Sequence, residues 1–259
     1  MAGPATDWNP GAYARFRGLR LRPALDLLAQ VGDLPAGDVI DLGCGNGAVA
    51  GALRTRFPYR CLIGVDNSPA MLAEAQGYDA TTLAEIAAWQ PEAPPALIFS
   101  NAALHWLGHH TALLPQLVGC LAAGGTLAVQ MPRQFDAPSH LLLRQLAQRL
   151  FPDRFDFSAY VPPVASPAAY WQRLAPLGDV TLWESEYLQH LGPVAEGHPV
   201  RAFTESTAMR PFLAQMDADE QTRFRAAYDA ALEQAYPRLA DGGALMPFRR
   251  LFLLLRRSD

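Results

Sequence analysis

The chain has 259 residues, of which 50% are hydrophobic and 18% charged, so it can bury a substantial core and is not expected to be disordered. The formal net charge of −4 gives no general attraction to nucleic acid. All 21 basic residues are arginine, so recognition of an anionic ligand must use guanidinium groups, whose forked geometry matches carboxylates.

The cysteines and the apolar runs indicate the compartment. Cys44, Cys61 and Cys120 are odd in number and have no Cys-x-x-Cys spacing, so we expect free thiols in a reducing compartment and no metal site. The N-terminus lacks a basic segment followed by an apolar run, and no apolar run approaches a membrane-spanning length of about 18 residues. We expect a cytoplasmic protein without a membrane partner.

The first 35 residues favour two short helices. Residues 7–18 begin with turn-forming residues and continue as a helix that bears aromatic side chains. Arg22-Pro23 is expected to open a second helix, because proline is tolerated early in a helix where no amide donor is needed. Gly32 and Pro35 are expected to end it.

From Val39 onward, predicted strands and helices alternate. The strands are expected at 39–42, 61–65, 81–83, 96–100 and 126–131, and the helices at 48–57, 68–75 and 112–121. This alternation predicts an α/β fold with a doubly wound, mostly parallel sheet. Ligands of such sheets bind beyond the carboxyl ends of the strands.

After Pro132 the pattern changes. Helices are expected at 137–150, 166–174 and 198–235, the last broken near Pro211, and strands at 179–188 and 248–255. Two closing strands separated by a helical insertion predict an antiparallel edge and a helical cap. We expect one domain over residues 1–259, with lid helices at about 7–31 and a cap at about 133–175 and 190–245.

The segment from Val39 to Gly47 predicts a buried strand, a glycine-rich turn and a helix start. Gly43 and Gly45 allow a ligand to approach the backbone closely, and the amides of the turn favour negative charge. Such a turn can hold either a dinucleotide pyrophosphate or the carboxylate of an amino acid.

Two acidic residues favour the amino acid. Asp41 stands where dinucleotide-binding folds usually have an apolar residue, and it could attract an ammonium group. Asp66 ends the next strand, about 20 residues after the glycines, where a carboxylate can bind ribose hydroxyls. S-adenosylmethionine would use both acids. The alternatives are NAD, since Gly43, Gly45 and Ala48 match a loose G-x-G-x-x-A pattern, and a turn with a structural role only.

Segments over nearly the whole chain carry a family resemblance. They are Asp7-Trp8-Asn9-Pro10, Arg22-Pro23-Ala24, Asp41-Leu42-Gly43-Cys44-Gly45, Gly64-Val65-Asp66, Ser68-Pro69-Ala70-Met71, Trp89-Gln90-Pro91, Asn101 to Leu107, Leu127 to Pro132, Met209-Arg210-Pro211 and Arg250-Leu251-Phe252. With them the chain resembles the class I S-adenosylmethionine-dependent methyltransferases and, more closely, the trans-aconitate 2-methyltransferase family. Between Ala75 and Trp89 the chain is a few residues shorter than the family pattern.

The resemblance implies a seven-stranded Rossmann-like methyltransferase fold. It also implies methyl transfer from S-adenosylmethionine to a carboxylate of a small polycarboxylic acid, with trans-aconitate as the expected acceptor and S-adenosylhomocysteine as product. A carboxylate is already ionised at neutral pH, so no catalytic acid or base is expected, and catalysis would come from alignment and exclusion of water. Alternatives are another small acid or a carrier-bound malonyl group as acceptor, and, in a different class, an NAD-binding or non-catalytic nucleotide-binding protein.

The resemblance also implies which residues bind the cofactor. Asp41, Gly43, Cys44 and Gly45 would hold the methionine end, Asp66 and Asn67 the ribose, Met71, Glu85 and Ile86 the adenine, and Asn101 would lie near the sulfur. Substrate contacts are hypothesised for Trp8, Tyr13, His105, Trp106, Arg133 and Arg210, with Arg20 and Arg250 as further cations and Arg133 the first choice. His109-His110 are expected in an exposed loop, and Trp171 in the core.

Overall fold

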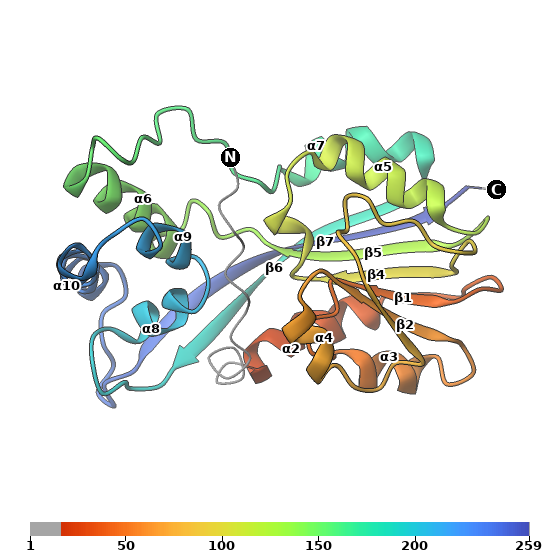
Figure 1. Cartoon of the computed structure of the whole chain (residues 1–259), viewed down its shortest axis with the longest axis horizontal. Helices are drawn as coiled ribbons and strands as arrows, with labels where there is room; N and C mark the ends of the chain where they lie inside the picture. The colour runs from red at the N-terminus through yellow and green to blue at the C-terminus, as the bar shows by residue number, and fades with distance from the viewer. Residues whose placement is uncertain (1–16, 259) are drawn as a thin grey trace. The chain divides into compact units, whose positions relative to one another are not determined.

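The computed structural model describes residues 17–258, with side chains from Leu21 onward (Figure 1). The elements in chain order are α2 (Arg17–Leu28), β1 (Val39–Leu42), α3 (Ala50–Arg56), β2 (Leu62–Asp66), α4 (Pro69–Glu74), β3 (Ala80–Leu83), β4 (Leu97–Asn101), the 3-10 helix η1 (Leu104–Trp106), α5 (His110–Cys120), β5 (Thr126–Pro132), α6 (Pro138–Leu150), α7 (Pro167–Leu174), the 3-10 helix η2 (Ala175–Leu177), β6 (Gly178–Leu191), α8 (Pro199–Glu205), α9 (Arg210–Leu213), α10 (Ala218–Ala235) and β7 (Ala244–Arg257).

The strands form one seven-stranded sheet in the order β3-β2-β1-β4-β5-β7-β6. The first five strands pair in parallel, and β7 pairs antiparallel with β5. All four residues of β1 are buried, and β4 and β5 are buried over nearly their whole lengths. Continuous apolar strands of this kind are typical of a parallel sheet covered on both faces. The predicted doubly wound sheet with an antiparallel strand is confirmed.

The chain divides into two compact units. The first contains the described residues up to Pro132 together with 163–185 and the segment from Arg250, and the second contains 133–162 and 186–249. The predicted cap at 133–175 and 190–245 overlaps the second unit, but α7 belongs to the first. Since β6 and β7 contribute residues to both units, the prediction of a single domain stays a prediction.

In the first unit, α5 and α7 lie on one side of the parallel strands and α2, α3 and α4 on the other (Figure 1). His110 begins α5, and its ring nitrogens lie 2.6 Å from the Tyr170 hydroxyl and 2.9 Å from the Leu104 carbonyl oxygen. The prediction that His110 is exposed was wrong, because it bonds α7 to the segment after β4. Trp171 was expected in the core but is 54% exposed, because α7 buries Tyr170 and Leu174 instead.

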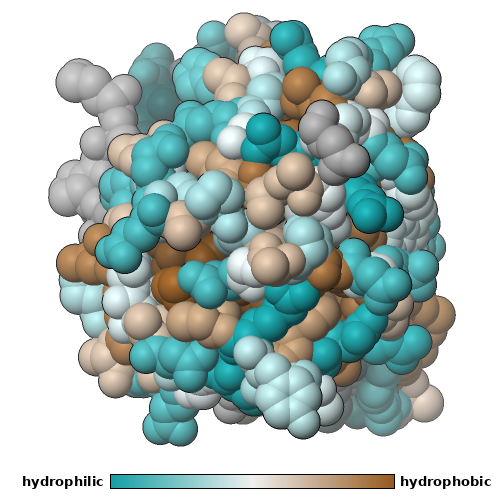
Figure 2. Space-filling view, turned by 90° about the vertical axis from the view of Figure 1, so that its right-hand side faces the viewer, coloured by the Kyte–Doolittle hydropathy of each residue, from teal (hydrophilic) through white to brown (hydrophobic). Residues whose placement is uncertain are grey.

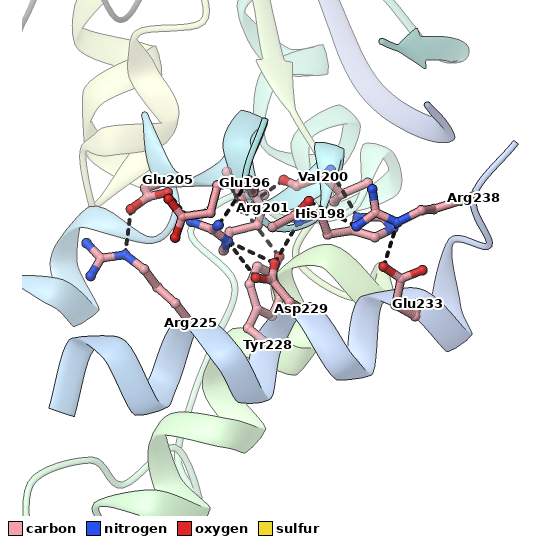
Figure 3. Close-up of polar contacts among 12 residues, drawn as sticks. Glu196, His198, Val200, Arg201, Glu205, Arg225, Tyr228, Asp229, Glu233 and Arg238 are labelled. Carbon is pink, nitrogen blue, oxygen red and sulfur yellow. Dashed lines mark hydrogen bonds and ion pairs between the residues drawn. The ribbon is translucent and has the colours of Figure 1, made fainter. Parts of the chain in front are cut away.

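In the second unit, α10 packs against α6 and α8 and buries Phe224, Tyr228 and Leu232. Arg201 of α8 is buried and donates to Asp229 of α10 and to Glu205, each at 2.8 Å (Figure 3). Glu205 also accepts from Arg225, at 2.7 Å. These charged groups therefore join α8 to α10.

Two predictions concern prolines within helical regions, and one of them was wrong. The second helix was expected to start at Arg22, but α2 already includes Arg17 and contains Pro23 within it. Proline removes one backbone donor, and this helix continues past that gap. The expected break near Pro211 is confirmed, because residues 198–235 form three helices, α8, α9 and α10. Pro211 lies in the first turn of the short α9, where a missing amide costs nothing.

Within the described residues, every helix is too short or too polar to cross a membrane.

Candidate active site

A glycine-rich turn follows β1 and reaches the segment after β4. Gly43 has a φ of +81°, in the left-handed region that favours glycine. A Cβ on Gly43 would lie 2.2 Å from the Ala103 Cβ, so this position has no room for a side chain. The amides of Gly43 and Cys44 both donate to the Val65 carbonyl, at 2.7 and 3.0 Å. The expected turn is present and is bonded to the end of β2.

Asp66 connects that turn to the start of α4. Its carboxylate accepts hydrogen bonds from the Gly45 amide at 2.8 Å and from the Ser68 amide at 2.9 Å. A carboxylate has about four lone-pair sites, so acceptor capacity remains for ribose hydroxyls. Asp66 is only partly buried, which leaves it accessible to a ligand. Its predicted role is compatible with this geometry.

Asp41 lies on β1 beneath the turn and is 2% exposed. Burial raises the pKa of its carboxyl to about 7, a hydrogen bond from Tyr78 opposes that rise, and the charge of Asp66 adds to it. The Tyr78 hydroxyl donates to Asp41 Oδ2 at 2.7 Å. A buried acid with this pKa is suited to a cationic partner such as an ammonium group.

Tyr78 is a site residue that the sequence did not reveal. Its ring also lies against Gly47 and Gly64, since a Cβ on either glycine would come within 3.2 Å of it. Burial raises the pKa of the Tyr78 hydroxyl, which therefore stays protonated and can donate to Asp41. The only available signal was a large aromatic residue in the short segment between α4 and β3.

The residues expected to contact adenine come from α4 and from the segment after β3. Ser68 caps α4 by accepting from the Met71 amide at 3.2 Å, and Met71 is buried. Asn67 Nδ2 donates to Glu85 Oε1 at 3.1 Å, so these two side chains meet. Ile86 is buried, and its Cδ1 would lie 3.5 Å from a Cβ on Gly43. The first unit thus brings Ile86 to the glycine turn, and Glu85 to the end of β2.

Asn101 ends β4, where its Oδ1 is buried without a hydrogen-bond partner among the described residues. His105 and Trp106 follow in η1 with their rings 4.7 Å apart. His105 is half-buried, whereas Trp106 is 47% exposed. Asn101 thus lies at the carboxyl end of β4, and His105 and Trp106 lie beyond it, where ligands of such sheets bind.

Comparisons with known proteins assign the family. A family model described as a methyltransferase domain matches residues 13–191. A trans-aconitate 2-methyltransferase of Methylobacterium nodulans is 43% identical over 97% of this chain and 99% of its own length. The enzyme of the same name from Klebsiella pneumoniae is 39% identical over 98% and 99%. The chain belongs to the trans-aconitate 2-methyltransferase family. The predicted family, the methyltransferase class and the dependence on S-adenosylmethionine are therefore confirmed, and the NAD-binding alternative is not retained.

Solved structures support the fold. The YcgJ protein of Bacillus subtilis matches 92% of this chain and 99% of its own with a TM-score of 0.57 at 13% identity. Phosphoethanolamine N-methyltransferase 2 of Haemonchus contortus, in complex with phosphomonomethylethanolamine and S-adenosylhomocysteine, matches 92% of this chain and 53% of its own with a TM-score of 0.52 at 15% identity. At these identities the likeness concerns the fold alone.

Cys44 of this family member is not suited to nucleophilic chemistry. Its side chain is buried, and burial together with the charges of Asp41 and Asp66 raises the pKa of the thiol. The Sγ donates weakly to the Gly45 carbonyl at 3.6 Å. Cys44 therefore stays a neutral thiol within the turn.

The predicted substrate contacts are distributed unevenly. Trp8 and Tyr13 lie outside the described residues, as does the side chain of Arg20. Arg133 and Arg210 belong to the second unit, and both are partly buried. The Arg133 amide donates to the Arg249 carbonyl at 3.0 Å, and Arg210 begins α9. Their contacts with a substrate stay predictions.

Proposed function

We propose that this protein transfers the methyl group of S-adenosylmethionine to a carboxylate of trans-aconitate, giving a monomethyl ester and S-adenosylhomocysteine. The observation that carries the proposal is the near full-length relationship to trans-aconitate 2-methyltransferases. The glycine turn, Asp41 and Asp66 support it, because together they suit a nucleoside that carries both an ammonium and a carboxylate.

The cofactor would be held by residues of the first unit. The turn at Gly43 and Gly45 would let the methionine end approach the backbone closely, because neither glycine carries a side chain, and Asp41 would attract the ammonium. Asp66 would accept bonds from the ribose, and Met71, Glu85 and Ile86 would hold the adenine. Cys44 and Asn67 would contact the same cofactor, and Asn101 would lie near its sulfur. The bound cofactor supplies an electrophilic methyl group on a sulfonium.

The chemistry requires alignment rather than a base. A carboxylate oxygen of the acceptor forms a bond to the methyl carbon while the carbon–sulfur bond breaks, and the electron pair of that bond stays on sulfur. The two opposite charges cancel, and no proton moves. The task of the protein is to orient the two reactants and to exclude water, and orientation can lower such a barrier by about 7–11 kcal/mol.

The acceptor would be recognised by arginines. A tricarboxylate needs several cations, and the chain contains no lysine. Arg133 and Arg210 are the first candidates, with His105 and Trp106 beyond β4 as further contacts. Trp8 and Tyr13 would contact the substrate from the N-terminal segment.

Initial rates with a panel of acids test the acceptor. We expect trans-aconitate to give the highest kcat/KM, with saturated and dicarboxylic analogues slower, and S-adenosylhomocysteine to inhibit competitively with S-adenosylmethionine. A higher kcat/KM for another small acid or for a malonyl carrier would replace the acceptor and retain the chemistry. Absence of methyl transfer to every acid, with S-adenosylhomocysteine still bound, would refute the proposal of carboxyl methylation.

A further inference from the structure

Polar side chains of three neighbouring strands lie on one face of the first unit's sheet. Asn101 of β4 is paired with Gln130 of β5, and Gln130 is paired with Phe252 of β7. Paired residues in a sheet point to the same face, and so do residues two apart along a strand. Arg250, two residues before Phe252, therefore shares the face of Gln130 and Asn101. Asn101 and Gln130 lie near the carboxyl ends of β4 and β5. Arg250 lies beside them on β7, where it pairs with Pro132, the last residue of β5.

The same face carries Asp41. It pairs with Gly64 on one side and Phe99 on the other, and Phe99 stands two residues before Asn101. The residue expected to attract the cofactor's ammonium and the polar group around Gln130 thus occupy one face, with Asn101 on the strand between them. An acceptor bound at Gln130 would therefore lie on the cofactor's side of the sheet.

The burial of this polar group is unusual. Gln130 is fully buried and Arg250 is 2% exposed. The Arg250 guanidinium donates from Nη1 to Gln130 Oε1 at 3.3 Å. Gln130 Nε2 and Asn101 Oδ1 are buried with no hydrogen-bond partner in the described part of the chain. A buried amide donor without a hydrogen-bond partner lowers the free energy of unfolding. A ligand that accepts a bond from this donor would remove that cost.

We propose that Gln130 and Arg250 form a subsite for a carboxylate of the acceptor that is not methylated. This inference rests on the proposed function. The Gln130 amide offers a neutral N–H donor and Arg250 a cationic one, and a carboxylate accepts from both at once. The contact between Arg250 and Gln130 Oε1 turns the amide so that Nε2 is left for the ligand. Arg250, within the first unit, becomes a stronger candidate than the sequence alone suggested.

The competing interpretation is a structural brace between β5 and β7. Such a brace would consist of the bond from Arg250 to Gln130 and of the stack of Trp183 on Phe252, whose ring centroids are 4.8 Å apart. A brace needs the bond between Arg250 and the amide oxygen, but it has no use for Nε2. The two interpretations therefore differ in what a change at Nε2 alone should do.

Gln130→Glu separates them. It replaces Nε2 by an oxygen of nearly equal size and retains an acceptor for Arg250, which gains an anionic partner. A brace is preserved or strengthened, whereas a carboxylate subsite loses a donor and gains a repulsive charge. We expect the KM for trans-aconitate to rise about tenfold or more, with the Kd of S-adenosylhomocysteine unchanged within about twofold.

Arg250→Lys is the second variant, because it keeps the charge but loses the guanidinium fork. We expect it also to raise the KM for the tricarboxylate. The increase should shrink for analogues with fewer carboxylates, since these leave the subsite empty. Arg256→Gln, an exposed arginine at the other end of β7, is the matched control and should leave the KM unchanged.

The outcomes are distinguishable. A folded Gln130→Glu protein with an unchanged KM for trans-aconitate would overturn the subsite and favour the brace, as would an Arg250→Lys effect that is equal for all acids. If the unmodified protein methylates no polycarboxylic acid, the proposed function fails before either variant is compared.

Discussion

Asp41 combines two properties at the residue level, burial and a hydrogen bond from Tyr78. Burial raises its folded-state pKa to about 7, well above that of an exposed aspartate. Between about pH 4 and pH 7 the folded protein therefore binds the proton that the unfolded chain releases. In that window the contribution of Asp41 to stability falls as the pH rises.

We expect the melting temperature of the ligand-free protein to decrease from pH 5 to pH 8, with part of this decrease absent in Asp41→Asn. The amide cannot ionise, so it removes the cost of charging a buried group. Thermal unfolding of both proteins at matched ionic strength measures the difference. Parallel curves across the whole range would contradict the raised pKa.

Binding of the cofactor should show the opposite pH dependence. An ammonium group beside Asp41 favours the charged carboxylate, so the affinity for S-adenosylhomocysteine should increase as the pH rises through about 7. Asp41→Asn should lower the affinity by about tenfold and remove this dependence. Tyr78→Phe removes a bond that lowers the pKa, so it should move the midpoint to higher pH. Calorimetric titration from pH 6 to 8 provides the measurement.

The arginines of the second unit give a prediction for substrate affinity. Replacing Arg133 or Arg210 by alanine should raise the KM for a polyacid by about tenfold or more, because each would remove a charge-assisted hydrogen bond. Arg149→Ala, an exposed arginine of α6, is the control and should behave as the unmodified protein does. Unchanged kinetics in both Arg133 and Arg210 variants would remove them from the substrate site.

At the level of elements, α4 illustrates how a short helix depends on its cap. Its six residues follow Ser68-Pro69, and Ser68 accepts from the Met71 amide. The helix α7 begins in the same way, with Ser166-Pro167 and a bond from the Ala169 amide at 3.3 Å. The two caps are matched in chemistry and belong to one unit, but only α4 adjoins the predicted cofactor site.

Ser68→Ala and Ser166→Ala should each lower the free energy of unfolding by about 1 kcal/mol, as removal of a helix cap usually does. Only Ser68→Ala should also weaken binding of S-adenosylhomocysteine, because Met71 and the backbone beside Asp66 depend on α4. Urea unfolding and calorimetry on both variants test this. If both variants bind S-adenosylhomocysteine with equal affinity, α4 does not support the cofactor site.

The elements also show what the sequence could predict. The strands β1, β2, β4 and β5 were located to within a residue or two, because buried parallel strands are continuous apolar runs bounded by glycine, proline or aspartate. The start of the helix at Arg17 was misjudged, because proline is compatible with both the start and the interior of a helix.

The parts of the candidate site that lie within one short stretch of sequence could be predicted. Gly43, Gly45 and Asp66 have backbone roles that follow from a turn and a strand end, and the structure brings them together. The contact between Tyr78 and Asp41, and that between Gln130 and Arg250, join residues 37 and 120 positions apart. Such partners depend on strand order and register, which sequence periodicity does not specify.

At the scale of the molecule, charged groups occur both at the surface and in buried ion pairs. On the face shown in Figure 2, hydrophilic and hydrophobic residues are interspersed. In the second unit, Arg201 is buried and paired with Asp229 and Glu205 (Figure 3). Pairs at the surface contribute about 0–1 kcal/mol, whereas loss of one partner from a buried pair leaves an uncompensated charge.

Asp229→Asn should therefore lower the free energy of unfolding by about 3 kcal/mol, since Arg201 would lose a charged acceptor at 2.8 Å. Glu233→Gln on the same helix is the control. It removes a partner of Arg238 in a largely exposed pair and should cost less than about 1 kcal/mol. Chemical unfolding of the two variants compares these costs, and equal values would contradict the role of burial.

The central claim is that a carboxylate of trans-aconitate receives the methyl group. The most direct measurement is mass spectrometry of the products formed from trans-aconitate and S-adenosylmethionine carrying an isotopically labelled methyl. We expect one labelled, base-labile monomethyl ester for each S-adenosylhomocysteine formed. Absence of label in any ester, while the protein binds S-adenosylhomocysteine, would contradict the claim.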